Sequence, residues 1–180
     1  MPIHLGKHPS REGWLSFETD AYLTDTKARL YSRCLPCLTG TYEQLKAGAR
    51  EIELTHAWTC WKVTAVVADD AECVAVLEAF GDAFPDEEVR GKIGGGVGRP
   101  TCAVIFHTES EERRDQLLAM LSRVLDARFP GRAAVVSRGC GIPYEQLLGP
   151  WPAWKPVSPI LRLDRVDEVR AALHDSLYRR

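Results

Sequence analysis

The sequence predicts an α+β protein with a ferredoxin-like βαββαβ core, in which an antiparallel sheet carries helices on one face. Three observations lead to this prediction. Runs rich in β-branched and aromatic residues cover 60–68, 88–93, 101–107 and 133–138, and such runs are typical of strands. Helical periodicity follows the first and the third run. The order strand, helix, strand, strand, helix, strand is that of a split βαβ unit; an α/β layered fold is the alternative.

Composition places the chain among ordinary globular proteins. It has 180 residues, of which 45% are hydrophobic and 27% charged, and a formal net charge of -2. The near-neutral charge disfavours wholesale nucleic-acid binding. The apolar runs are too short to span a bilayer, and the first residues contain no apolar signal region. We therefore expect a cytoplasmic protein without membrane association, whose six cysteines are mostly free thiols.

Residues 1–57 are predicted to form an N-terminal extension packed on the core domain, which covers 58–180. Residues 1 to about 13 are polar and predict an irregular arm, and 14–18 partly alternate like a short strand. A weak helical pattern then runs to Pro36, which is expected to break it. Thr41 can cap a further helix over 42–50, and 51–54 fit either a strand or a helix end.

The two core helices have clearer limits. Asp69 and Asp70 are candidate caps for the first, which Pro85 ends. Its apolar positions recur at steps of three and four residues, which makes one face: Cys73, Val74, Val76, Leu77, Phe80 and Phe84. The second helix is expected to start at Thr108 or Ser110 and to stop at Pro130.

The C-terminal part is a Pro/Trp-rich segment followed by a helix. Four prolines lie between 150 and 159, so regular structure is not expected there. Trp151 and Trp154, with Tyr144, are expected either to cover a surface groove or to stack on a planar ligand. Residues 166–178 predict a terminal helix with Asp164 as its cap.

The candidate ligand site is the glycine-rich stretch 89–101, which contains five glycines and three cations. Glycines let backbone amides converge on an anion without interference from Cβ atoms. The predicted ligand-binding residues are Arg90, Lys92, Gly94, Gly95, Gly96, Gly98 and Arg99. The stretch matches neither a Walker loop nor a Rossmann fingerprint. A plain hairpin connection with solvated cations is the structural alternative.

Within this stretch, Gly91-Lys92-Ile93-Gly94 resembles a short piece of the pattern of nitrogen-regulatory PII-like proteins. Those proteins are also ferredoxin-like, with a mobile loop between the second and third strands. The resemblance covers these four residues and no further signature of that family, so it does not assign the chain.

Two cysteine arrangements are candidates for metal or redox chemistry. Cys34-x-x-Cys37 has the spacing of half a zinc site or of a redox pair, with no second such motif in the chain. Cys140 lies between two glycines just after a strand, where a nucleophile can be exposed, and His107 is the candidate base. The alternative for both is packed, inert thiol.

These observations favour a ligand-sensing or regulatory module that binds a small anionic ligand at the loop 90–101. The alternatives are an RNA-associated protein and a cysteine-based metal or redox protein. The sequence leaves open whether the protein is an enzyme. Sheets of this class often pair through edges or faces, so we expect a homo-oligomer.

Overall fold

The computed structural model describes residues 3–7, 12–19, 23–95, 98, 100–139 and 141–178, without the side chains of 23–33 and 142. The chain divides into two compact units. The first contains Met1–Lys27 and Trp61–Ser137, and the second contains Ala28–Cys60 and Arg138–Arg180. The predicted division into an extension over 1–57 and a core domain over 58–180 groups the chain differently from these two units and stays a prediction.

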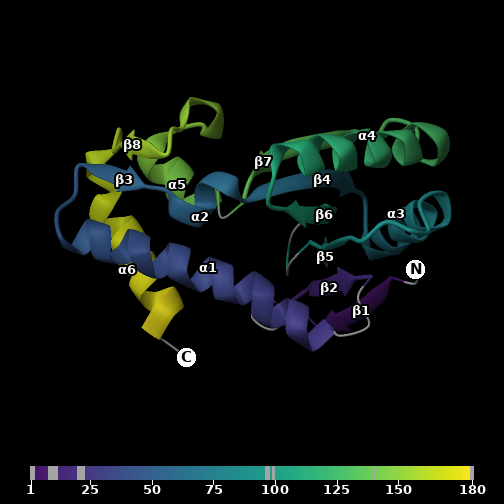
Figure 1. The fold of residues 1–180 in the computed structure, drawn as a ribbon, viewed down its shortest axis with the longest axis horizontal. Coiled ribbons are helices and arrows are strands. Elements are labelled where there is room, and N and C mark those ends of the chain that lie inside the picture. Colours follow the sequence, from purple (N-terminus) through teal and green to yellow (C-terminus); the bar gives the residue numbers. More distant parts are fainter. Residues whose placement is uncertain are drawn as a thin grey trace. The chain divides into compact units, whose positions relative to one another are not determined.

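The sheet of the first unit has six strands in the described part of the chain, in the spatial order β1-β2-β5-β6-β4-β7 (Figure 1). The neighbours β1–β2, β2–β5, β5–β6 and β4–β6 are antiparallel. The strands are β1 (His4–Lys7), β2 (Trp14–Glu18), β4 (Trp61–Val67), β5 (Arg90–Gly94), β6 (Cys102–Thr108) and β7 (Ala134–Arg138). With its helices, the protein is therefore a mixed α+β structure with a mostly antiparallel sheet.

Two helices, α3 (Asp70–Ala83) and α4 (Glu111–Arg128), cover one face of this sheet. Both start at caps that the sequence predicted, because Asp69 accepts a hydrogen bond from the Glu72 amide and Ser110 accepts one from the Arg113 amide. Their apolar faces and alternate strand residues share one core, whose larger members include Phe17, Val63, Phe80, Val104, Phe106, Leu121 and Leu125. Gly91 is needed in β5, because a Cβ there would overlap the Ile105 carbonyl oxygen and the Phe17 ring.

The second unit is mainly helical. It contains most of α1 (Leu23–Lys46), together with α2 (Thr55–Thr59), α5 (Gly141–Leu148) and α6 (Val166–Tyr178). The short strands β3 (Glu51–Glu53) and β8 (Val157–Pro159) form an antiparallel pair, and 3-10 turns cover Trp151–Ala153 and Leu163–Arg165. A separate core joins these elements: Cys37, Leu45, Ile52, Leu54, Ala57, Tyr144, Leu147, Leu148, Trp154, Ile160, Val169 and Leu173.

Several local predictions are wrong. Pro36 does not break the helix: α1 continues through it to Lys46 and replaces the two helices expected there. Pro36 costs the helix one backbone hydrogen bond. The burial of Cys37 and Leu45 in the core of the second unit offsets this loss, so the helix continues. Residues 4–7 are a strand, because β2 supplies their pairing partners. The proline-rich segment includes β8, in which Pro159 pairs with Glu51 in a two-stranded sheet that tolerates proline.

Candidate functional site

The glycine-rich stretch connects two neighbouring antiparallel strands, β5 and β6. Arg90, Lys92 and Gly94 belong to β5 itself. Gly95 is buried directly after the strand, and Gly98 is exposed with a positive φ of 77°. Gly96 and Arg99, which the sequence also predicted as ligand-binding, lie outside the described residues.

Strand register brings three basic side chains into one line across the sheet. Lys62 on β4 pairs with His107 on β6. Gly91 pairs with Phe106, which puts Arg90 on the other side of His107. Because side chains alternate along a strand, all three point to the face opposite the buried Val63 and Phe106. Lys92 lies two residues from Arg90 and shares this face. We call Lys62, His107, Arg90 and Lys92 the basic row.

Acidic and aromatic neighbours hold the basic row in place. Arg90 forms an ion pair with Glu109, which follows β6. The Lys92 ammonium lies 4.7 Å from the centre of the Trp14 ring, a cation–π contact. Glu18, 6% exposed, pairs with Arg90 in the β2–β5 register. The face is therefore a mixed polar surface in which two carboxylates balance part of the positive charge.

A second group of polar side chains lies where the glycine-rich stretch meets α3. The Cys102 thiol donates a hydrogen bond to the Asp70 carboxylate, with 3.3 Å between Sγ and Oδ1. One ligand atom each from Asp70, Cys73 and Cys102 lie within 4.8 Å of one another. Among the described residues, this is the one group of three metal-ligating side chains brought so close together. We call it the thiol–carboxylate cluster.

The two thiols of this cluster are protonated at neutral pH in the absence of a ligand. Burial raises the pKa of the Cys73 thiol to about 12, and a hydrogen bond with the Gly94 backbone only partly opposes this effect. Burial, followed by the hydrogen bond to Asp70, also raises the pKa of Cys102. Neither thiol is thus an activated nucleophile.

Sequence reasoning missed this cluster. Cys73 was predicted only as one apolar position of a helix face, and Cys102 only as part of a buried strand. The available signals were Asp70 and Cys73 three residues apart at a helix start, and Cys102 directly after the glycine-rich stretch. Neither signal indicates that the start of α3 contacts Cys102 on β6, because this contact depends on the tertiary packing.

The other predicted cysteines are arranged differently. Cys34 and Cys37 lie within α1 on either side of Pro36, and Cys37 is buried in the core of the second unit. A regular helix, rather than the start of one after a strand, surrounds this motif, which is not the setting of a thioredoxin-like pair. Cys140 lies outside the described residues, so the predicted pairing with His107 does too. His107 is instead part of the basic row.

Two of the three aromatic residues proposed for base stacking, Tyr144 and Trp154, belong to the core of the second unit, and Trp151 is partly buried against that core. Tyr144 is 1% and Trp154 4% exposed, and their ring centres lie 5.7 Å apart. The Tyr144 hydroxyl lies 2.9 Å from the Thr41 hydroxyl, and the Trp154 indole donates a hydrogen bond to the Gly149 carbonyl. Tyr144 and Trp154 are therefore not available to stack on a base or a planar ligand.

Among the described residues, no helix combines the length and the apolar composition that crossing a bilayer requires. No family model, curated protein or solved structure matches this chain.

Proposed function

We infer that β4, α3, β5, β6, α4 and β7 form a ferredoxin-like unit. Two features support this inference: the chain order βαββαβ, and the spatial order β5-β6-β4-β7. In such a unit one helix connects the first strand to the second and another connects the third strand to the fourth, as α3 and α4 do here. The β1–β2 pair then extends the sheet beyond β5.

We propose that the protein is a ligand-sensing or regulatory module, and that the basic row binds a small anionic ligand at the start of β5, the opposite end of this strand from the glycines that follow Gly94. The observation that carries the proposal is the register that lines up Lys62, His107 and Arg90. Three neighbouring strands position these groups, so little side-chain ordering is needed on binding. Phosphate and carboxylate groups are the ligands that such side chains recognise, with Arg90 able to bind in bidentate fashion.

The ion pair between Arg90 and Glu109 supplies a means of sensing. An anion that takes the place of Glu109 on Arg90 releases this carboxylate. Glu109 lies directly before Ser110, the cap of α4. Ligand binding is thereby coupled to the start of a core helix, which is what a regulatory module requires.

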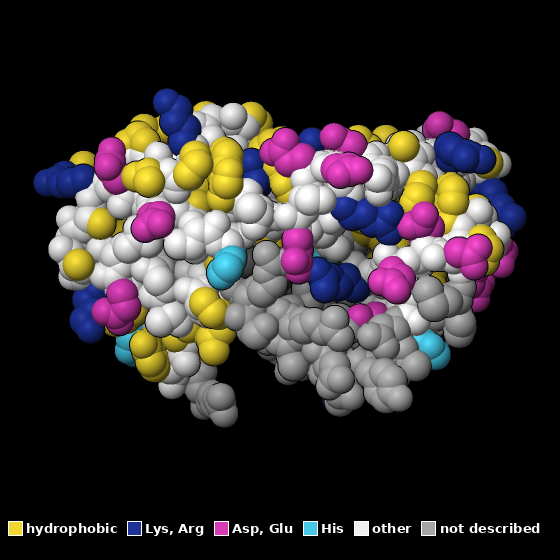
Figure 2. Space-filling model, viewed as in Figure 1, with side chains coloured by type: hydrophobic (Ala, Val, Ile, Leu, Met, Phe, Trp, Pro, Cys, Tyr) yellow, Lys and Arg dark blue, Asp and Glu magenta, His cyan; other side chains and the backbone are white. Residues whose placement is uncertain are grey.

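A small anion is favoured over RNA, which was an alternative from the sequence. On the face shown in Figure 2, Lys and Arg side chains alternate with Asp and Glu side chains among the residues drawn in colour. Nucleic-acid binding depends on neutralising many phosphates together, which such a surface does poorly. Of the three aromatic side chains suggested for base stacking, Tyr144 and Trp154 are also buried, and Trp151 is half-buried.

The test is binding of inorganic phosphate, pyrophosphate and citrate to the whole chain at low salt, by calorimetry. The double variant Arg90→Gln, Lys92→Gln should bind these anions about ten-fold more weakly or worse, because charged hydrogen bonds are lost. Glu109→Gln should strengthen binding, because the competing carboxylate is removed. Arg128→Gln is the matched control, since Arg128 is an exposed cation paired with Asp82. If no anion binds, or if all variants bind equally, the basic row is not a ligand site.

Homo-oligomerisation is part of the same proposal. β7 is the last strand in the order of the sheet, where a second copy can pair, and its Val135 side chain is 53% accessible. Native mass spectrometry reports the number of subunits, and a monomer at micromolar concentration would contradict the expectation.

A further inference from the structure

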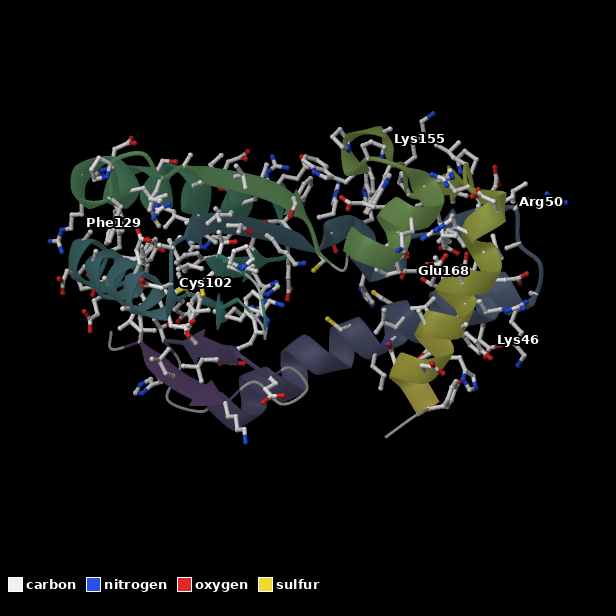
Figure 3. The ribbon with its side chains drawn as sticks, turned by 180° about the vertical axis from the view of Figure 1, so that it is seen from behind. Lys46, Arg50, Cys102, Phe129, Lys155 and Glu168 are labelled. Carbon is white, nitrogen blue, oxygen red and sulfur yellow. The ribbon has the colours of Figure 1, made fainter. Side chains whose placement is uncertain are left out.

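The thiol–carboxylate cluster joins three elements of the first unit. Asp70 and Cys73 lie one turn apart at the start of α3, so their side chains share one side of the helix. Cys102 is the first residue of β6, and Figure 3 shows its side chain beside α3. The end of β5 completes the surroundings through the Gly94 backbone and Gly95.

We propose that Asp70, Cys73 and Cys102 form a binding site for a divalent metal ion of the zinc class. This site is distinct from the basic row and does not depend on the anion-binding proposal. Zinc–sulfur bonds of about 2.3 Å and zinc–oxygen bonds of about 2.0–2.2 Å place tetrahedral ligand atoms roughly 3.5–3.8 Å apart. The three ligand atoms already lie within 4.8 Å of one another, so modest side-chain rotation suffices.

The donor set selects the kind of metal. Two thiolates with one carboxylate suit a borderline-soft ion such as Zn²⁺, whereas Mg²⁺ and Ca²⁺ require oxygen donors. Cys73 is fully buried, Cys102 is half-buried and Asp70 is exposed. The site thus has an inner side formed by the core and an outer side toward solvent. Three protein ligands leave a fourth position for water or another small ligand.

The glycine-rich stretch contributes the wall of this site. A Cβ at Gly95 would lie 2.9 Å from the Cys102 sulfur and 2.6 Å from the Thr101 carbonyl oxygen. Only glycine therefore lets the chain pass so close to the thiol. The hydrogen bond between the Gly94 backbone and Cys73 is the type of outer contact that orients a metal-bound sulfur. These two glycines have a role here that requires no anion.

Cobalt(II) titration of the whole chain in the presence of a phosphine reductant tests the proposal. The native protein should bind one Co²⁺ per chain, with thiolate-to-cobalt charge-transfer absorption that Zn²⁺ abolishes. Cys102→Ser should lose this absorption. Asp70→Asn should lower the affinity for cobalt by roughly 10- to 100-fold or more, because removing even an outer-shell contact of a metal site has an effect of that size.

Cys34→Ser is the matched control, because Cys34 is also a half-buried cysteine but lies in the other unit. It should leave the cobalt spectrum unchanged. If Cys102→Ser does not fold, Asp70→Asn carries the test, since Asp70 is exposed. The proposal is overturned if the native chain gives no thiolate absorption, or if Cys34→Ser removes it while Cys102→Ser does not. The second result would assign the metal to Cys34 and Cys37.

Discussion

Glu72 is the residue whose contacts best connect local chemistry to stability. Its carboxylate accepts two hydrogen bonds from the Arg132 guanidinium, at 2.9 and 2.8 Å, and a third from the Ala68 amide. The hydrogen bonds from Arg132, followed by the one from Ala68, lower the pKa of Glu72 below its ordinary value of 4.5. Glu72 thus ties the start of α3 to the chain between α4 and β7.

Glu72→Gln should destabilise the protein at neutral pH by about 1 kcal/mol, because a charged acceptor is replaced by a neutral one. A carboxyl group with a lowered pKa in the folded state stabilises that state above pH 4.5. Its contribution disappears as the pH falls through the lowered pKa. The difference in melting temperature between native protein and variant should therefore be largest near pH 7 and shrink below pH 4.

The control for this measurement is Glu78→Gln, an exposed position on the same helix. Its melting temperature should follow that of the native protein at every pH. A difference between Glu72→Gln and the native chain that stays constant down to pH 3 would contradict the role given to the Glu72 carboxylate.

At the same scale, the candidate site was only partly predictable. Arg90 and Lys92 were identified because cations and glycines lie together in the sequence. His107 was predicted as a base for Cys140, which lies outside the described residues. The register that puts His107 beside Arg90 depends on a hairpin whose alignment the sequence does not specify. Cys73 and Cys102 were assigned to the core because their contact with Asp70 arises only in the folded chain.

At the scale of elements, the best-predicted features were those with strong local signals. Asp69 and Ser110 cap α3 and α4, and the four core strands lie within a few residues of their predicted limits. In these segments the caps, periodicity and flanking breakers all agree. The α+β class with a mostly antiparallel sheet could therefore be predicted from residues 58–138.

Elements that depend on distant partners were not predictable in the same way. The segment at residues 4–7 is a strand because β2 lies next to it, and β8 exists because β3 does. Pro36 shows the opposite case, in which a strong local breaker is overruled by the burial of Cys37 and Leu45. Local propensity is a weak guide wherever tertiary contacts supply most of the stability.

At the scale of the whole molecule, the main feature is that the described residues form two hydrophobic cores that share no residue. The core of the first unit contains Leu121, and that of the second contains Leu147; both side chains are fully buried. Each unit thus has the apolar interior that cooperative folding requires.

Leu121→Ala and Leu147→Ala should each cost about 2–5 kcal/mol, as buried leucine truncations generally do. Hydrogen exchange measured by mass spectrometry should locate the two effects differently. Leu121→Ala should speed exchange mainly in 61–137, whereas Leu147→Ala should do so mainly in 28–60 and 138–180. Uniform acceleration by both variants would mean that the chain opens as a single cooperative unit.

The pairing of β3 with β8 has a consequence for synthesis on the ribosome. Ile52 pairs with Ser158, and all of Trp61–Ser137 lies between them in the chain. The second unit is therefore begun early in translation but receives its remaining strand and helices last. While the first unit is being synthesised, residues 28–60 lack the partners in 138–180 with which their apolar side chains form a core. We therefore expect this segment to be a chaperone-binding site on the nascent chain.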